Sequence, residues 1–289
     1  MSASRDASAH TMQAPAVETF LAEFHDRRPG LTPKAFAGLP VDFQGTARAS
    51  SYEVLASAVP TRPPDVAVLD LACGDGYLLS LLASRAQPGL VLCGVDLSAG
   101  ELAAARTRLG QAVSLVQARA QHLPYGSGRF DCVLCHMALM LMDDAGRVLR
   151  EVRRVLKPGG RFAAIVGAAP PPSAALTLYV EAIKRQTRQA QWTAVRFGDG
   201  RLRTTEGIAE LFGAQRFSSL VTEDLQIAMR LGPPEIWLRL LDMYDLYLLG
   251  DAERLSVERE FHEEATAASG PDGKLDFPIA LRYLGALAS

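Results

Sequence analysis

The sequence carries little excess charge of either sign. Its 289 residues include 30 lysines and arginines against 32 aspartates and glutamates, so the formal net charge is −2 and the isoelectric point lies near 6.2. Such a chain has no general attraction to phosphate polymers, and we expect no nucleic acid among its partners. No apolar run reaches about 18 residues, so we expect no membrane span and no membrane partner.

Cysteine is also scarce. The four cysteines, Cys73, Cys93, Cys132 and Cys135, fall in or beside stretches expected to be core strands. Residues 1–14 lack the apolar core of a signal peptide and are expected to be a flexible tail, so we expect reduced thiols and a cytoplasmic protein. Cys132 and Cys135 have the C-x-x-C spacing, but on a strand this spacing sends the side chains to opposite faces. We therefore expect no metal site.

Helical and strand patterns alternate along the first half of the chain. Val17, Phe20, Leu21 and Phe24 predict an amphipathic helix over 15–26, and a second helix is predicted to end at Pro60. Strands are predicted near 66–71, 91–96, 113–118, 130–135 and 161–167, and helices near 76–86, 99–109 and 144–156. Ser98 and Glu101 predict a capping box on the second of these helices. Alternating units of this length predict a parallel sheet with right-handed crossovers.

The pattern loosens after residue 167. Helices are predicted over 174–190, 204–213, 235–249 and 252–267, with strands inside 217–231 and over 275–287. This order predicts an antiparallel pair that closes the sheet, with helical insertions before and inside it. Helices placed over the carboxyl ends of the strands would form a lid, where substrate choice usually resides.

A glycine turn follows the first predicted core strand. The run from Asp70 to Gly76 reads Asp-Leu-Ala-Cys-Gly-Asp-Gly, and Asp96 closes the next strand. Glycines let backbone N–H groups approach a ligand, and a carboxylate at the neighbouring strand tip accepts both hydroxyls of a ribose. A dinucleotide site would need a third glycine where Leu79 stands. This leucine blocks close packing of helix on strand and argues against a nicotinamide-dependent dehydrogenase, while Asp70 suits an ammonium group better than a diphosphate.

These residues resemble motif I of the class I S-adenosylmethionine-dependent methyltransferases. The resemblance continues through Leu123–Asp131, which is similar to the loop into strand four, and through Leu149–Arg161, which is similar to helix D, the turn and strand five. It is nearest to the small-molecule group that includes the ubiquinone/menaquinone C-methyltransferases. The resemblance implies an α/β fold with a Rossmann-like, doubly wound, seven-stranded and mostly parallel sheet, N-terminal helices and a helical lid insertion. It also implies S-adenosylmethionine as the cofactor.

The resemblance divides the chain into four parts. Residues 1–14 are the tail, 15–60 are N-terminal helices that cover the cofactor site, 61–167 are the cofactor-binding core, and 168–289 hold the lid insertions and the closing strands. The methionine part of the cofactor is expected at Asp70, and the ribose at Asp96 with Leu97 against the adenine. The full set of expected cofactor-binding residues is Asp70, Ala72, Cys73, Gly74, Gly76, Asp96, Leu97, Ala118, Arg119, Ala120, Gln121 and Cys135.

Two positions depart from the family pattern. Ala72 stands where the family commonly has glycine, and Arg119 stands where it usually has an acidic residue that accepts from the adenine amino group. Arginine cannot accept a hydrogen bond. Either Gln121 or the backbone around Ala118 and Ala120 makes this contact, and Arg119 either stacks over adenine or turns into solvent.

The methyl acceptor is expected beside His136, which follows the fourth predicted strand. An imidazole titrates near neutral pH and could accept a phenol, enol or amine proton, or it could only shape the pocket. The expected acceptor-binding residues are Tyr52, His136, Met137, Met140, Trp192, Arg196, Trp237 and Tyr244. The basic stretch from Lys184 to Arg203 is either a solvated helix face or a site for a carboxylate or phosphate on the acceptor.

We therefore expect an enzyme that transfers a methyl group from S-adenosylmethionine to carbon, oxygen or nitrogen of a small metabolite, in specialised metabolism. The alternative is a cyclase or another non-methylating protein that binds S-adenosylmethionine on the same fold. The apolar segment 235–249 either covers the pocket or packs against a second subunit, so a homo-oligomer through the lid helices is a further hypothesis.

Overall fold

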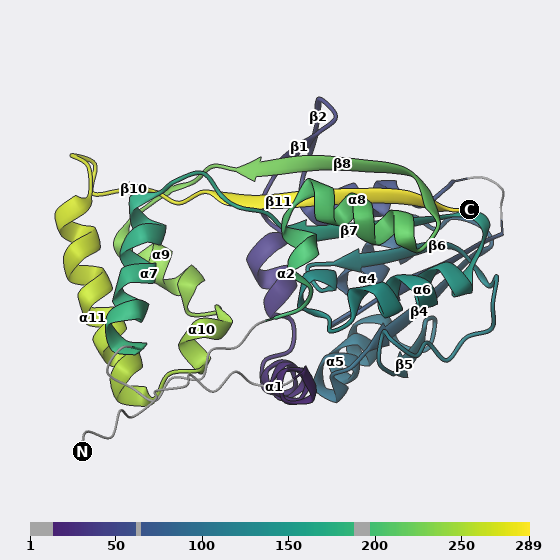
Figure 1. Ribbon diagram of the computed structural model, residues 1–289, viewed down its shortest axis with the longest axis horizontal. Helices are drawn as coiled ribbons and strands as arrows, with labels where there is room; N and C mark the ends of the chain where they lie inside the picture. The colour runs from purple at the N-terminus through teal and green to yellow at the C-terminus, as the bar shows by residue number, and fades with distance from the viewer. Residues whose placement is uncertain (1–13, 62–64, 188–196) are drawn as a thin grey trace, which may run out of the picture. The chain divides into compact units, whose positions relative to one another are not determined.

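A computed structural model of the chain describes residues 14–61, 65–187 and 197–289 (Figure 1). The chain divides into two compact units. Among the described residues, the larger unit holds 18–61, 65–169, 197–227 and 280–289, and the smaller holds 14–17, 170–187 and 228–279. In the part of the chain that the structure describes, no helix is both long enough and apolar enough to cross a membrane.

The larger unit is built on a seven-stranded sheet. Its spatial order is β5-β4-β3-β6-β7-β11-β8. The strands are β3 (Val66–Leu71), β4 (Leu90–Asp96), β5 (Ser114–Gln117), β6 (Phe130–His136), β7 (Leu156–Gly167), β8 (Phe217–Ile227) and β11 (Ile279–Ala288). The first five strands pair in parallel, and β11 runs antiparallel to β7. The predicted Rossmann-like α/β fold is confirmed, and its reversal of strand order beside β3 is where ligands bind in open α/β sheets.

Helices connect these strands and bury apolar faces against the sheet. They are α4 (Tyr77–Ala83), α5 (Ala99–Leu109), α6 (Ala145–Val155) and α8 (Thr205–Ala214). The segment before β3 adds α1 (Ala14–Arg27), α2 (Leu31–Phe36), the hairpin β1 (Val41–Phe43) and β2 (Thr46–Arg48), and α3 (Ser51–Ser57). Short 3-10 turns cover Leu139–Leu141 and Gly200–Arg203. The core includes fully buried Leu69, Phe130, Val133 and Phe162, which fixes the strands whose tips carry the site.

The smaller unit is mainly helical. It contains α7 (Ala174–Thr187), α9 (Pro233–Leu240), α10 (Tyr244–Tyr247), α11 (Asp251–Ala268), and the pair β9 (Arg230–Leu231) and β10 (Leu275–Asp276). Its core is buried around Tyr179, Trp237 and Phe261, and the ring centroids of the latter two lie 5.6 Å apart. Arg185 of α7 binds Glu260 and Glu264 of α11, each at 2.8 Å between nitrogen and oxygen.

Several predicted boundaries were wrong. The single helix expected over 235–249 is two helices, because Met243 adopts an extended backbone between α9 and α10. The strand expected over 275–287 is interrupted at Pro278, which has no N–H to donate to a ladder. Strand β7 begins at Leu156 instead of 161, because a bulge absorbs the Pro158–Gly160 turn. The short helix α2 and the hairpin β1–β2 were missed.

Leu79 lies where a dinucleotide site would have its third glycine, and a glycine on β4 makes room for it. Leu79 of α4 is fully buried against β4, and β4 has Gly94 opposite it. A Cβ on Gly94 would lie 2.9 Å from Leu79 Cδ1 and 2.8 Å from Cys73 Sγ. The glycine that gives α4 its room therefore lies on the neighbouring strand, and Leu79 does not prevent close packing of the helix.

Candidate functional site

The turn between β3 and α4 has a left-handed backbone at three positions. Ala72, Gly74 and Gly76 have φ of 58°, 52° and 77°. Glycine adopts this region freely, whereas alanine does so at a cost of about 1–2 kcal/mol. A Cβ on Gly76 would lie 2.6 Å from Leu109 Cδ1, so this glycine also allows α4 to approach α5. The Ala72 backbone is therefore strained, but it keeps the conformation of the turn.

Asp96 at the tip of β4 is held by the backbone on both sides. One carboxylate oxygen accepts from Gly74 N at 2.8 Å, and the other accepts from Ser98 N at 2.8 Å. Burial raises the pKa of Asp96, and these two N–H donors oppose that shift. A carboxylate has about four acceptor sites, so acceptor capacity is left for ligand hydroxyls. The predicted capping box is half formed: Ser98 Oγ accepts from Glu101 N, but the Glu101 side chain turns to the N-terminal segment.

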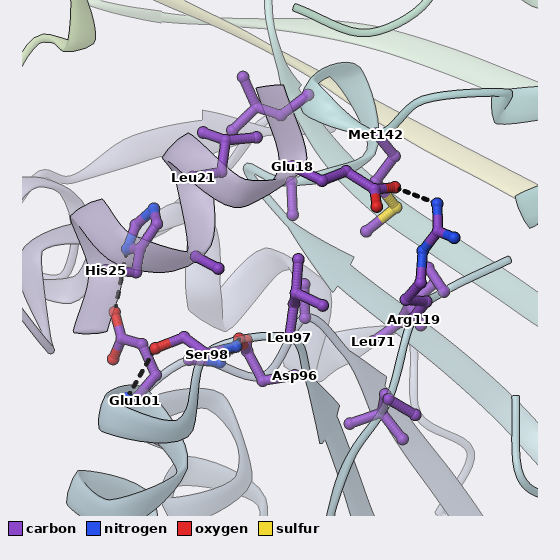
Figure 2. A pocket seen from close by; sticks show the side chains of 18 of the residues that line it. Glu18, Leu21, His25, Leu71, Asp96, Leu97, Ser98, Glu101, Arg119 and Met142 are labelled. Carbon is purple, nitrogen blue, oxygen red and sulfur yellow. Dashed lines mark hydrogen bonds and ion pairs between the residues drawn. The ribbon is translucent and has the colours of Figure 1, made fainter. Parts of the chain in front are cut away.

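A cavity of about 140 Å³ opens beside Asp96 (Figure 2). The tips of β3, β4, β5 and β6 form its floor, and α1 forms one wall. The residues that line it are Glu18, Leu21, Ala22, His25, Thr32, Leu71, Ala72, Gly74, Val95, Asp96, Leu97, Ser98, Glu101, Ala118, Arg119, Ala120, Gln121, His136, Met137, Ala138, Leu141 and Met142.

Hydrogen bonds fasten the N-terminal segment beside this cavity. Asp26 accepts from Ser98 Oγ at 2.6 Å and from Gly100 N at 2.9 Å, and these donors lower its pKa. Glu101 pairs with His25 Nδ1 at 3.2 Å and accepts from Gly30 N at 3.0 Å. The first turn of α5 is therefore satisfied partly by side chains from another segment, as helix N-termini require.

Asp70 lies inside the protein behind the cavity wall. Its side chain is buried, and its Oδ2 has no hydrogen-bond partner among the described residues. Burial, followed by the charges of Asp96 and Asp75, raises the pKa of this carboxyl well above its ordinary range. An ammonium group near Asp70 would relieve this unfavourable charge.

The substitution Asp70→Asn is expected to stabilise the ligand-free protein by about 1–2 kcal/mol at pH 8, because it removes an unpaired buried charge. The folded pKa is raised, so the stability cost in the wild type is absent below the unfolded pKa of about 3.9 and grows as pH rises above it. Urea unfolding at pH 5 and pH 8 measures this. The control is exposed Asp65→Asn, and a gain that does not grow with pH would contradict the argument.

His136 is enclosed by aromatic rings. Tyr52 stacks on its imidazole with ring centroids 3.7 Å apart, and Phe36 contacts it edge-on at 5.9 Å. Its Nε2 lies 2.9 Å from Ser51 Oγ, while Nδ1 has no hydrogen-bond partner among the described residues. Burial lowers the pKa of His136 to about 3, so the imidazole is neutral at physiological pH.

We expect the nitrogen chemical shifts of the His136 imidazole to stay constant between pH 5 and pH 8. A folded pKa near 3 leaves the ring neutral throughout this window, whereas an unperturbed histidine titrates near 6.5. Long-range proton–nitrogen NMR spectra of the ligand-free protein measure this, with His136→Gln to assign the signal. A midpoint between 6 and 7 would contradict the burial argument.

The side of the cavity next to β5 holds the unusual Arg119. Its guanidinium pairs with Glu18 Oε1 of α1 at 2.7 Å, while about half of the Arg119 side chain is exposed to solvent (Figure 2). Gln121 Nε2 donates to the same Glu18 oxygen at 3.0 Å and to the carbonyl of Asp143 at 2.8 Å. Both side chains therefore present donors to Glu18.

The structure brings together eight of the twelve expected cofactor residues on the cavity wall. These are Ala72, Gly74, Asp96, Leu97, Ala118, Arg119, Ala120 and Gln121. Asp70, Cys73, Gly76 and Cys135 do not line the wall; the two cysteines are buried, and burial raises the pKa of each thiol. Glu18, Leu21 and His25 were missed, because an amphipathic period indicates a buried helix face without indicating which surface buries it.

The expected acceptor residues are more scattered. His136 and Met137 line the cavity, Tyr52 packs behind His136, and Met140 packs against the core without reaching the wall. Trp237 and Tyr244 belong to the smaller unit, where the Trp237 side chain is buried in the core. Trp192 and Arg196 lie outside the described residues. In the basic stretch, Lys184, Arg185 and Arg201 all form ion pairs with carboxylates.

Comparison with known proteins supports the same interpretation of the core. Residues 69–164 match the sequence profile of the family described as "Methyltransferase domain". This part of the chain is therefore similar to a methyltransferase domain. The matched region runs from within β3 to within β7 and contains the glycine turn, Asp96 and His136, so the features that face the cavity come mainly from this region.

Curated proteins are similar to part of this chain. A demethylmenaquinone methyltransferase of Symbiobacterium thermophilum is 37% identical over 114 residues, covering 38% of this chain and 45% of that protein. Methyltransferase GfsG of Streptomyces halstedii is 39% identical over 101 residues, covering 33% of this chain and 36% of that protein. The matched region thus spans less than half the length of these relatives.

Solved structures resemble a larger part of the fold. A crystal structure from Bacillus halodurans, described as a methyltransferase by similarity, has a TM-score of 0.53, 18% identity, and covers 82% of this chain and 97% of that one. The (4+2)-cyclase SpnF has a TM-score of 0.57, 19% identity, and covers 96% and 98% of the two chains. At these identities the likeness concerns the fold alone.

Proposed function

We propose that this protein binds S-adenosylmethionine and transfers its methyl group to a small metabolite. The observation that carries the proposal is the Asp96 carboxylate, which the N–H groups of Gly74 and Ser98 hold at the cavity, within the region that matches a methyltransferase domain. A fixed carboxylate suits the two hydroxyls of a ribose. The unpartnered oxygen of Asp70 suits the cofactor's ammonium group.

When bound, the cofactor would supply an electrophilic methyl group, which the acceptor would take as the neutral thioether leaves. The protein's own contribution is to orient the two reactants and exclude water. Ala72, Gly74 and Asp96 line the side assigned to the cofactor, while His136 and Met137 line the side assigned to the acceptor. The apolar Leu141 and Met142 also line the cavity and favour a small, partly apolar acceptor.

We assign His136 to the acceptor side. In the neutral tautomer that carries its proton on Nε2, where it donates to Ser51 Oγ, Nδ1 can accept a hydrogen bond from the methyl acceptor. The pKa of about 3 makes it a weak base, so the structure favours orientation of the acceptor over removal of a proton before methyl transfer. A carboxylate or phosphate on the acceptor stays a proposal, as does self-association through the helices of the smaller unit.

Calorimetry with S-adenosylhomocysteine tests the cofactor part of the proposal. The wild-type protein is expected to bind, and the matched Asp96→Asn variant is expected to bind much more weakly. Absence of heat and of thermal stabilisation by both S-adenosylmethionine and S-adenosylhomocysteine would refute it.

Methyl transfer is tested with methyl-labelled S-adenosylmethionine and a small-molecule extract. Labelled products are identified by mass spectrometry, with heat-inactivated protein as the control. Binding without a labelled product across a broad acceptor panel would favour the alternative, a cyclase or another non-methylating protein.

A further inference from the structure

Glu18 lines the part of the cavity next to β5 and belongs to α1, which lies outside the matched residues 69–164. Its carboxylate accepts from Arg119 at 2.7 Å and from Gln121 at 3.0 Å, both through Oε1. The Oε2 atom makes no hydrogen bond within the described residues, and the Glu18 side chain keeps 17% of its surface accessible. Glu18 is thus a fixed anion with spare acceptor capacity at a cavity wall (Figure 2).

The geometry of the strand tips orients a nucleoside in this cavity. Asp96 lies on β4, between β3 on one side and β5 on the other. The unpaired carboxylate of Asp70 belongs to β3, so a cationic tail is favoured on that side. The base then lies over β5, where Leu97 and Ala118 provide apolar surface for a flat ring.

An adenine placed there needs a hydrogen-bond acceptor for its amino group. Arg119 carries only donors, and Gln121 Nε2 is also a donor toward this side. Glu18 supplies the anionic oxygen that these two residues cannot supply, and their donors hold it in place. A charge-assisted hydrogen bond is about twice as strong as a neutral one.

We infer that Glu18 is the residue that recognises the adenine amino group, and that it selects adenine over hypoxanthine nucleosides. The inference rests on the proposed function and deepens it by assigning base specificity to α1. Hypoxanthine has a carbonyl oxygen where adenine has its amino group, so the Glu18 carboxylate would meet an acceptor and be repelled. The acid on the β5 side of the cavity is therefore Glu18 of α1, and its partner Arg119 follows the end of β5.

Calorimetry with two ligands, S-adenosylhomocysteine and S-inosylhomocysteine, tests this inference. The wild type is expected to prefer the adenine ligand by at least about tenfold, as loss of one charge-assisted hydrogen bond implies. Glu18→Gln is expected to reduce the ratio of the two dissociation constants to about threefold or less. Glu23→Gln is the matched control, since Glu23 lies on the same helix, is exposed and pairs only with Arg27 among the described residues.

Exchanging the charges of Glu18 and Arg119 distinguishes recognition of adenine by Glu18 from a role of Glu18 in holding α1 in place. The double variant Glu18→Arg with Arg119→Glu keeps an ion pair and moves the acid to the strand tip, so the preference for adenine is expected to return. Glu18→Arg alone is expected to lose it. A wild type that binds neither ligand would overturn the proposed function. Binding with an unchanged ratio in Glu18→Gln, or an equal loss for both ligands, would overturn the inference alone.

Discussion

Asp96→Asn is expected to weaken binding of S-adenosylhomocysteine about a hundredfold. Two charged hydrogen bonds to ribose hydroxyls would become weaker or be lost, and about 3 kcal/mol corresponds to this factor. The amide also places an NH2 group against the N–H of either Gly74 or Ser98, which now donate to the carboxylate at 2.8 Å. Calorimetry measures the affinity, and urea unfolding measures the accompanying loss of stability.

A matched variant shows whether the effect belongs to the site. Asp131→Asn changes another strand carboxylate, which accepts from Ala67 N at 2.9 Å and pairs with Lys157 at 2.8 Å. Asp131 does not line the cavity, so its loss is expected to change stability without changing affinity. Equal affinity of wild type and Asp96→Asn would refute the ribose assignment.

Gly94→Ala is expected to lower the free energy of unfolding by about 2 kcal/mol. The new methyl group would lie within 2.9 Å of atoms of Cys73, Leu115 and Leu79, all packed around β4. Overpacking of this kind costs about 1–3 kcal/mol, which outweighs the gain of roughly 0.5–1 kcal/mol from replacing a strand glycine. Urea unfolding measures the change.

Gly213→Ala is the control for this experiment. Gly213 lies in α8 with open space where the new methyl group would lie, so the alanine variant should be slightly more stable. The double variant Gly94→Ala with Leu79→Ala relieves one of the three close contacts. Its destabilisation is expected to be smaller than the sum of the two single losses. If the two losses of stability simply add in the double variant, the packing of Leu79 does not depend on the space at Gly94.

The larger part of the fold could be predicted from the sequence because its signals are local. Helix α5 lies at the predicted residues 99–109, and the glycine turn and Asp96 fall at the ends of adjacent parallel strands. Contacts between distant segments gave no such signal. Nothing in the sequence around Glu18 indicates Arg119 as its partner, and nothing around Leu79 indicates that Gly94 makes room for it.

The role of a strand-tip residue was also hard to predict from its type alone. His136 has an ordinary titration range in isolation, but its enclosure by Tyr52 and Phe36 depends on where α2 and α3 pack. The helix α2 was not predicted, since its six residues are too short for a clear period. The surroundings of His136 therefore lower its pKa below the expected range, whereas its position at the end of β6 is as predicted.

The attachment of α1 through carboxylates has a consequence for how fast a molecule in the cavity exchanges. Glu18, Asp26 and Glu101 join this helix to β5 and α5, and α1 is one wall of the cavity. A bound molecule loses that wall when the helix detaches, so its residence time depends on the lifetime of these polar bonds. Added salt weakens the exposed ones among them, so the residence time of a bound molecule is expected to shorten as the salt concentration rises.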